Sequence, residues 1–423
     1  MKEDFLHYCW KFKKFSSLVF ELTTGENLHI ISFGIHNHDQ GPDFLNAEIE
    51  IEGIKWIGNI EIHVNSSDWN NHNHHHDSKY NNVILHVVFN HNKDIINSNG
   101  SQIPTLELKN YIDSSLIDSY NEFIKPSLPC ASFLPEIDHL TLLQFKDRFF
   151  VERLDYKSKL VNELLIENNG DWLETFFQLL AKSFGIKVNQ QAFLELSQTV
   201  SIKIVQRLGD EFKTEAVLLG NSGLLNVSSD DSYIKDLQKE YNYQKGKFSF
   251  YCMPYDTWKF SKMRPSNFPT IRIVQLAKLI TSSQNLLDDL VISKPSYEKI
   301  FSRLNIVIEE GYWLDHYTID NISKPAPKSI GKQMVNSIII NTIVPFAYWY
   351  GKLNKVEYLN WIDSVMEEIS YENNKVTRLF SQIQLEHAKD SQAVIHCYNT
   401  MCINKKCLDC VIGSNILRKK QDQ

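Results

Sequence analysis

The chain has 423 residues, of which 43% are hydrophobic and 22% charged, and its formal net charge at pH 7 is −7. This composition excludes a small disulfide-stapled fold and a disordered chain, and the length predicts two or three domains. A negative net charge gives no general attraction to phosphate polymers, so nucleic-acid binding would need a locally basic groove.

Targeting signals and membrane spans are not expected. The N-terminal stretch MKEDFLHYCWKF lacks the apolar core and cleavage site of a secretory signal, and seven cysteines in a chain this long suit a reducing compartment. The most apolar stretch, VNSIIINTIVPFAYWYG (335–351), contains polar residues and a proline, and it is too short to span a membrane. We therefore expect a cytoplasmic protein without membrane contact, and this stretch to form a buried helix.

The N-terminal part, residues 1–125, is predicted to be a β-rich domain. A short opening helix over EDFLHYCWKF is followed by segments that alternate apolar and polar residues or carry β-branched runs, which are typical of strands. A polar link after the third strand starts with capping residues, which predicts a short helix at about 76–82. The predicted strands cover residues 28–34, 47–53, 55–64, 82–90 and 103–109.

A proline-rich segment at 125–137 breaks both periodicities and marks a domain boundary. Beyond it, leucine and phenylalanine recur at three- and four-residue steps, which predicts a mostly α-helical domain over 138–423 that ends in a cysteine-rich tail. The predicted helical segments cover 139–168, 172–185, 189–208, 271–290, 328–350 and 355–390. The fold class is therefore α+β.

The first candidate site lies on the predicted strands of the N-terminal domain. Asp43 follows Gly41-Pro42 before the second strand, and Glu61 and His63 lie near the end of the third, on one side of it because strand side chains alternate. The order helix, three strands, helix, strand resembles the core of the PD-(D/E)XK nucleases. That resemblance implies that Asp43 and Glu61, with the carbonyl of Ile62, bind Mg²⁺ or Mn²⁺. His63 stands where these nucleases have a lysine, and a neutral histidine does not supply the lysine's charge.

Two other interpretations of these acids remain open. They can line the wet face of a strand pair, as alternating strands ordinarily do, with Glu48 and Glu50 on the adjoining strand. An intact Glu107-Leu108-Lys109 tripeptide also occurs on a later strand, but it lies far along the chain from Asp43.

A cluster of imidazoles and carboxylates near the same strands forms a second candidate, because these groups suit Zn, Mn or Fe. Its spacing matches no standard metal motif. There are alternatives to metal binding. Residues 72–76 are also typical of a solvated polar loop. Asp68 is also typical of a helix-capping residue, and Trp69 is typical of a core residue. The members of the cluster are His63, Asp68, His72, His74, Asp77 and His86.

The tail supplies a third candidate. Cys402, Cys407 and Cys410, with Cys397 or His396 upstream, offer four soft ligands in a turn-rich segment, as a structural Zn²⁺ or an iron–sulfur cluster requires. The alternative is a set of reduced core cysteines in a terminal helix.

Arg264 and Arg272 form the fourth candidate. They flank the stiff turn Pro-Ser-Asn-Phe-Pro that opens an apolar helix, a geometry suited to binding the phosphate or carboxylate of a substrate. The alternative is a buried arginine pair that fixes a loop. The nucleotide-binding and serine-hydrolase motifs do not occur in the sequence.

Several long motifs together resemble the bacterial domain-of-unknown-function family 2851: DFLHYCWKF, GPDFLNAEIEI, WIGNIEIHVNSSDW, YNNVILHVV, IPTLEL, MRPSNFPTIRIVQLA and CINKKCLDCVIG. They run from residue 4 to near residue 415, so the resemblance covers essentially the whole chain. It implies that the β-rich and helical parts belong to one architecture.

The leading hypothesis is a Mg²⁺-dependent phosphodiesterase or nuclease with Asp43, Glu61 and His63 in its active site. The alternatives are a non-catalytic nucleic-acid-binding or scaffold protein on a nuclease-like sheet, and another metal-dependent hydrolase centred on His63, Asp68 and His86. The sequence makes no prediction of the oligomeric state.

Overall fold

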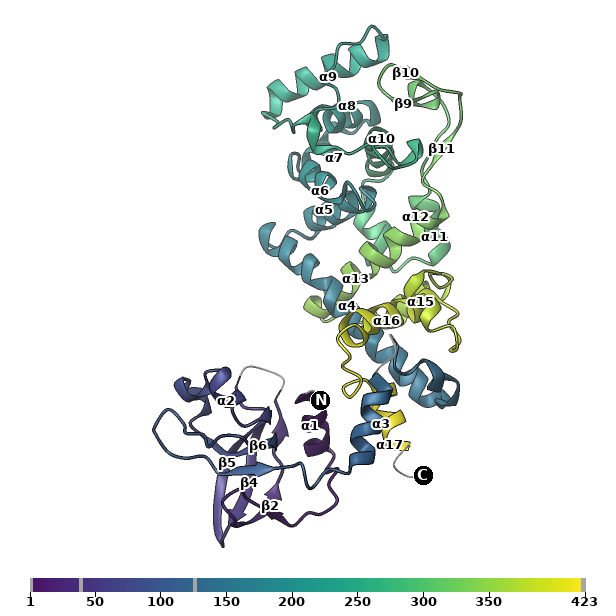
Figure 1. Ribbon diagram of the computed structural model, residues 1–423. Helices are drawn as coiled ribbons and strands as arrows, with labels where there is room; N and C mark the ends of the chain where they lie inside the picture. Colours follow the sequence, from purple (N-terminus) through teal and green to yellow (C-terminus); the bar gives the residue numbers. More distant parts are fainter. Residues whose placement is uncertain (1–2, 38–40, 125–127, 420–423) are drawn as a thin grey trace. The chain divides into compact units, whose positions relative to one another are not determined.

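A computed structural model describes residues 3–37, 41–124 and 128–419, and the chain forms two compact units (Figure 1). Unit 1 comprises Met1–Phe145, Arg378–Ile383 and Cys397–Gln423. Unit 2 comprises Lys146–Thr377 and Gln384–His396. The predicted domain limit at residue 125 and part of the turn before Asp43 lie outside the described residues.

Unit 1 is built on a seven-stranded mixed sheet in the order β1-β2-β4-β5-β6-β7, with β3 paired to β4. The pairs β5/β6 and β6/β7 are parallel and the others antiparallel. The strands are β1 (Phe20–Glu21), β2 (Asn27–Ser32), β3 (Ile35–His36), β4 (Phe44–Ile51), β5 (Ile54–Asn65), β6 (Val83–Asn90) and β7 (Thr105–Glu107). The α+β class and the mixed N-terminal sheet are thus confirmed.

The residue pattern explains why these strands form a layered sheet. In β4, Ala47, Ile49 and Ile51 are buried while Glu48 between them is exposed, as period-two alternation requires. β6 has a parallel partner on each side and is buried along most of its length, consistent with its continuous run VILHVV. Helix α1 (Glu3–Lys11) lies against β5 and buries Phe5, Leu6, Tyr8, Cys9 and Trp10.

The link between β5 and β6 differs from the prediction. The α-helix there, α2 (Asp68–Asn71), is only four residues long, and two single 3₁₀ turns, η1 (His74–His76) and η2 (Ser78–Tyr80), occupy the region expected to be helical. Asparagine, aspartate and histidine are weak helix formers whose side chains compete for backbone hydrogen bonds. This composition therefore favours turns over a continuous helix.

The remaining elements of unit 1 are helical. They are α3 (Ser114–Ile124), the 3₁₀ segment η3 (Ala131–Glu136), the first turns of α4 (His139–Glu167), the π-helical turn η9 (Tyr398–Cys402) and α17 (Val411–Lys419). The predicted division placed the cysteine-rich tail with the helical part, whereas the compact units group it with the N-terminal sheet.

Unit 2 is mostly helical, as the leucine and phenylalanine periodicity predicts. Its helices after α4 are α5 (Trp172–Phe184), α6 (Gln190–Gln198), α7 (Ile202–Leu208), α8 (Glu211–Asn221), α9 (Ser232–Phe248), α10 (Pro269–Thr281), α11 (Tyr297–Leu304), α12 (Lys332–Ile338), α13 (Val344–Asn354), α14 (Leu359–Glu367), α15 (Lys375–Leu379), which continues into unit 1, and α16 (Ala388–Cys397). Two hairpin-like pairs interrupt them: β8 (Val307–Ile308) with β11 (Lys328–Ser329), and β9 (His316–Thr318) with β10 (Asn321–Ile322).

Two helix predictions in unit 2 can be followed to single residues. Gly185 is the C-cap of α5, whose N-cap Asp171 accepts hydrogen bonds from two backbone amides. The apolar stretch 335–351 forms α12, a π-helical turn over Ile339–Ile343, and α13, and it is largely buried. Among the described residues, no helix is long and apolar enough to cross a membrane.

Candidate metal centre

The structure brings Asp43 and Glu61 together, as the strand order predicts. The backbone N–H of Asp43 donates to Glu61 Oε2 over 3.2 Å, and the backbone N–H of Ile62 donates to Asp43 Oδ2 over 2.9 Å. These contacts follow from the antiparallel register, in which Phe44 at the start of β4 faces Ile60 of β5. Each carboxylate therefore accepts a backbone hydrogen bond from the segment that carries the other, which fixes the two segments side by side.

His63 joins this pair through its Nε2 atom. The other ring nitrogen, Nδ1, lies 2.8 Å from His86 Nε2 on the neighbouring parallel strand β6. Nε2 lies 3.1 Å from His72 Nδ1 and 3.6 Å from Glu61 Oε1. His86 thus fixes the ring of His63 from behind, an arrangement usual for metal-binding histidines.

His72 and His74 come from the link after β5. His74 Nε2 lies 3.2 Å from Glu61 Oε1, although the two atoms are not aligned as a hydrogen bond. The ligand atoms of His63, His72 and His74 all lie within 4.8 Å of one another. His74 is half-buried and turns back toward β5, whereas His72 is exposed, as expected for a solvated loop, with its Nδ1 atom beside His63 Nε2.

Local packing explains why this link turns inward. Asp68 Oδ2 accepts the backbone N–H of Asn65 over 3.0 Å, and Asn73 has the left-handed backbone conformation that reverses the chain, at φ 63°. Trp69 is fully buried, as predicted, and its ring meets His74 edge-on. Tyr80 stacks on His74, with ring centroids 3.8 Å apart, and also contacts Trp69 edge-on.

Burial controls the electrostatics of the cluster. It raises the pKa of Glu61 to about 9, and the charge of Asp43 adds to the shift. Burial also lowers the pKa of His63 to about 3, helped by the neighbouring His74 and His72. At neutral pH His63 is therefore an uncharged imidazole with a free electron pair for a metal ion.

Helix α1 adds two residues that the sequence analysis missed. His7 Nε2 lies 3.2 Å from Asp43 Oδ2, and Glu3 Oε1 lies 3.9 Å from His63 Nε2. Burial opposes the charge on His7, but the contact with Asp43 outweighs it and raises the pKa of His7. Burial and the charge of Asp43 raise the pKa of Glu3 to about 7. The signal was the spacing of Glu3 and His7, which are four residues apart and so share one helix face.

Three donor separations are close to those around a single first-row metal ion, and the imidazole nitrogens, which lie within 4.8 Å of one another, would draw together on binding it. Donors about 2.0–2.1 Å from a tetrahedral Zn²⁺ lie about 3.3–3.4 Å from each other. The pairs His63–His72, His74–Glu61 and His63–Glu61 are 3.1, 3.2 and 3.6 Å apart. Three imidazoles favour Zn²⁺, Mn²⁺ or Fe²⁺, whereas Mg²⁺ prefers oxygen ligands. The donor set therefore fits a nitrogen-binding ion better than Mg²⁺.

Other candidates in unit 1 lie away from this group. Asp77 caps the turn η2 by accepting the N–H of Lys79. Glu107 Oε1 accepts the N–H of His91 over 2.8 Å, and Glu48 is exposed on β4. Asp68 stabilises the segment between β5 and β6 through its hydrogen bond with Asn65, but it does not belong to the group of His63, His72 and His74.

The structure also places the tail and the arginine pair. Cys397 Sγ lies 3.9 Å from Cys402 Sγ, and Cys407 and Cys410 are buried in the same unit. His396, the alternative upstream ligand, belongs to unit 2. There its ring lies 3.9 Å from Glu152 and packs beside Phe149 and Tyr156. Arg264 and Arg272 line a cavity in unit 2.

Fold and donor set together define an α+β protein with a candidate metal centre beside the inner strand β5 of a mixed sheet. The chain belongs to the family described as "Protein of unknown function (DUF2851)", whose family model matches residues 3–375. The resemblance noted from the sequence motifs is thereby confirmed over residues 3–375, and the tail motif CINKKCLDCVIG lies beyond the matched residues. No curated protein and no solved structure matches the chain.

Proposed function

We propose that unit 1 is a metal-dependent hydrolase in which Glu61, His63, His72 and His74 bind one first-row metal ion. The observation that supports this most directly is the set of three imidazole nitrogens within 4.8 Å, next to a buried carboxylate oxygen. His72 is exposed, so solvent reaches that side of the group. A few protein ligands with one side open to water are typical of catalytic rather than structural metal sites.

Each neighbouring residue has a definable task in this proposal. A bound ion would polarise the scissile group and lower the pKa of water. His86 holds the His63 ring through its 2.8 Å contact, so that Nε2 faces the ion. Asp43 anchors β5 through the N–H of Ile62 and holds a proton on His7 Nε2. His7 can give that proton to a leaving oxygen.

The proposed substrate is a phosphodiester, as in a nuclease. Support comes from the order of elements and from the positions of Asp43, directly before β4, and Glu61, on the adjacent strand β5, as in the PD-(D/E)XK pattern. In this reaction water adds to phosphorus and one ester P–O bond breaks, which gives a phosphate monoester and an alcohol. Mg²⁺ or Mn²⁺ is the cofactor that this resemblance implies, and both ions suit the carboxylate of Glu61.

The test is hydrolysis by the metal-free full chain after addition of Mn²⁺, Zn²⁺ or Mg²⁺. The substrates are end-labelled single- and double-stranded DNA and RNA. Glu61→Gln should lower the rate at least a hundredfold, because it removes a charged ligand. Glu48→Gln is the matched control, since Glu48 is an exposed acid on the neighbouring strand β4. Cleavage that both variants retain equally would refute this assignment.

The alternative is a non-catalytic protein that binds nucleic acid or acts as a scaffold. Binding of the labelled strands without cleavage under any of the three ions would favour it. The proposed compartment is the cytoplasm, which is supported by the free state of all seven cysteines.

A further inference from the structure

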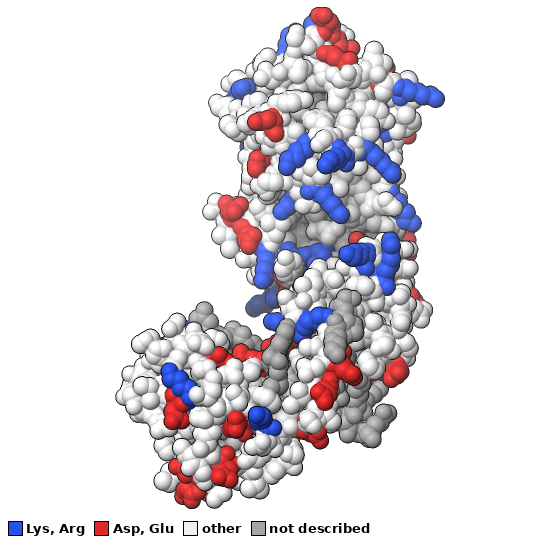
Figure 2. Space-filling model, in the orientation of Figure 1, with Lys and Arg blue, Asp and Glu red and all other residues white. Residues whose placement is uncertain are grey.

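A cavity of about 870 Å³ in unit 2 has a strongly basic lining. Figure 2 shows Lys and Arg side chains gathered on this face of the unit. Among the described lining residues, Glu372 is the single carboxylate. The cations that line the cavity are Lys182, Lys187, Arg264, Arg272 and Lys332.

Arg272 is a buried cation without a counter-ion. It is 3% exposed, and its guanidinium donates to neutral amide oxygens: Gln275 Oε1 at 2.8 Å and Asn267 Oδ1 at 2.6 Å. The third nitrogen, Nε, has no hydrogen-bond partner among the described residues. A buried charge that is not neutralised is costly, so an anion in the cavity would stabilise this side chain.

A second, half-buried cation, Lys157, lies beside the same wall. Lys157 Nζ donates to Ile340 O over 3.4 Å, to Gln392 Oε1 over 3.0 Å and to the Asn341 side chain, all neutral acceptors. Asn341 also lines the cavity. Arg272 is therefore the buried cation of this cavity that is held by neutral groups, whereas Lys157 has the cavity carboxylate Glu372 within electrostatic range.

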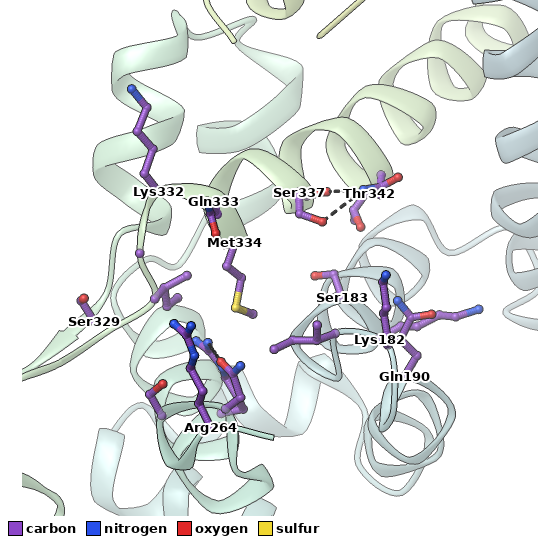
Figure 3. A pocket seen from close by; sticks show the side chains of 18 of the residues that line it. Lys182, Ser183, Gln190, Arg264, Ser329, Lys332, Gln333, Met334, Ser337 and Thr342 are labelled. Carbon is purple, nitrogen blue, oxygen red and sulfur yellow. Dashed lines mark hydrogen bonds between the residues drawn. The ribbon is translucent and has the colours of Figure 1, made fainter. Parts of the chain in front are cut away.

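The remaining lining suggests the shape of the ligand. Apolar side chains of Leu179, Ile186, Ile330 and Met334 alternate with the amides of Gln190 and Gln333. In Figure 3, Arg264 and Met334 reach toward the same space, with Lys182 and Ser183 on the facing helix α5. The volume lies within the range of about 300–1,000 Å³ found for small-molecule sites.

We propose that this cavity binds an organic phosphate of nucleotide size. Its phosphate would contact Arg264 and Arg272, because guanidinium forks pair well with phosphate oxygens. Its flat body would lie against Ile186 and Met334, with the amides of Gln190 and Gln333 to pair with polar edges. This site lies in unit 2 and is independent of the hydrolase proposed for unit 1.

The test is calorimetric titration of the full chain with AMP, adenosine and inorganic phosphate. AMP should bind at least tenfold more tightly than adenosine, and its affinity should fall as salt is raised. Arg264→Gln should weaken AMP binding about tenfold or more, because a charge-assisted contact is lost. Arg264 is exposed, so this variant should fold.

Arg207→Gln is the matched control, because Arg207 is an exposed arginine on α7 of the same unit and does not line the cavity. Equal AMP affinity in the two variants would overturn the proposal. So would an AMP affinity no greater than that of adenosine.

An independent observation concerns the cysteines of unit 1. Four come from the tail, Cys397, Cys402, Cys407 and Cys410, and they are joined by Cys130 from a segment more than 250 residues earlier in the chain. All five are buried free thiols. Cys397 contacts both Cys402 and Cys410, and Cys130 lies within electrostatic range of Cys402, Cys407 and Cys410.

We infer that four of these five thiols, Cys397 and Cys402 among them, bind a structural Zn²⁺. Zn–S bonds of about 2.3 Å in a tetrahedron place the sulfurs about 3.8 Å apart. The Cys397–Cys402 distance of 3.9 Å agrees with this value. The thiolates of a [4Fe–4S] cluster each bind a different iron and therefore lie farther apart, whereas a [2Fe–2S] cluster, in which two thiolates share an iron, is distinguished from zinc by elemental analysis.

Elemental analysis of the purified full chain tests this site. Wild-type protein should retain zinc after dialysis, Cys402→Ser should hold one zinc fewer per chain, and Cys252→Ser, which changes a cysteine of unit 2, should hold as much as wild type. Iron with the visible absorption of thiolate-bound iron would overturn the zinc assignment in favour of a cluster. Equal zinc in the two variants would overturn the site itself.

Discussion

The metal centre predicts a specific thermal stabilisation that depends on His74. If Glu61 Oε1 and three imidazoles bind one ion, adding Mn²⁺ or Zn²⁺ at a hundredfold excess over its dissociation constant stabilises the folded chain by about 2.7 kcal/mol. For a unit of this size, about 2–4 °C in Tm accompanies each kcal/mol, so the expected shift is about 5–10 °C. Mg²⁺ should give a smaller shift, because nitrogen donors outnumber oxygens at the site.

His74→Gln supplies the critical comparison. A hundredfold weaker site would be only half occupied at the same metal concentration, which leaves about 0.4 kcal/mol of stabilisation and a shift of about 1 °C. The assay is differential scanning fluorimetry of chelator-treated full chain, with isothermal titration to count the ions bound. His75→Gln is the control, because His75 is the next histidine but lies outside the clustered group and packs at a tilt against His76. Equal shifts in the two variants, or a larger shift with Mg²⁺ than with Zn²⁺ and Mn²⁺, would refute the reasoning.

Three further changes probe stability and positioning. Burial raises the pKa of Glu215 from 4.5 to about 7, so the stability that the protonated acid gives the fold is complete below pH 4.5 and is lost as the pH rises to 7. In urea denaturation, wild type should lose about 3 kcal/mol over this pH range relative to Glu215→Gln. Parallel pH profiles of the two proteins would contradict this. Gly58→Ala places a methyl group 2.4 Å from Ile84 Cγ2, so the free energy of unfolding measured by chemical denaturation should fall by about 1–3 kcal/mol. An unchanged denaturation midpoint would contradict the close packing of β5 against β6. Asp68→Ala removes the acceptor for the backbone N–H of Asn65, so metal affinity measured by chelator competition should fall about 10- to 100-fold. Unchanged affinity would show that the conformation of the segment between β5 and β6 does not depend on this hydrogen bond.

The sequence predicted the parts of unit 1 that depend on periodicity. Alternation along β4 and β5, with a turn between them, was enough to bring Asp43 beside Glu61, because antiparallel register follows from a short connection. It did not predict the inward turn of His74. That turn depends on the left-handed Asn73 and on the packing of Trp69 and Tyr80, which are tertiary contacts without a local signature.

Contacts between distant segments were also beyond the sequence. Cys130 meets the tail cysteines only once the C-terminal residues join the N-terminal unit, and no spacing rule links such remote positions. The two-residue strands of unit 2, such as β8 and β11, are too short to show alternation. The basic cavity was anticipated at Arg264 and Arg272, whereas Lys182 and Lys332 reach it from other helices.

The histidine at position 63 gains a physical explanation from these contacts. A lysine here would place an ammonium against His72 and His74, where burial already lowers the pKa of His63 to about 3. A neutral imidazole avoids that cost and offers an electron pair to the same ion that Glu61 approaches. The nuclease-like pattern and the histidine cluster, which the sequence presented as competing hypotheses, therefore share Glu61 and His63 and describe one site. In that site a metal ion held by nitrogen donors would supply the positive charge that a lysine supplies in the PD-(D/E)XK pattern.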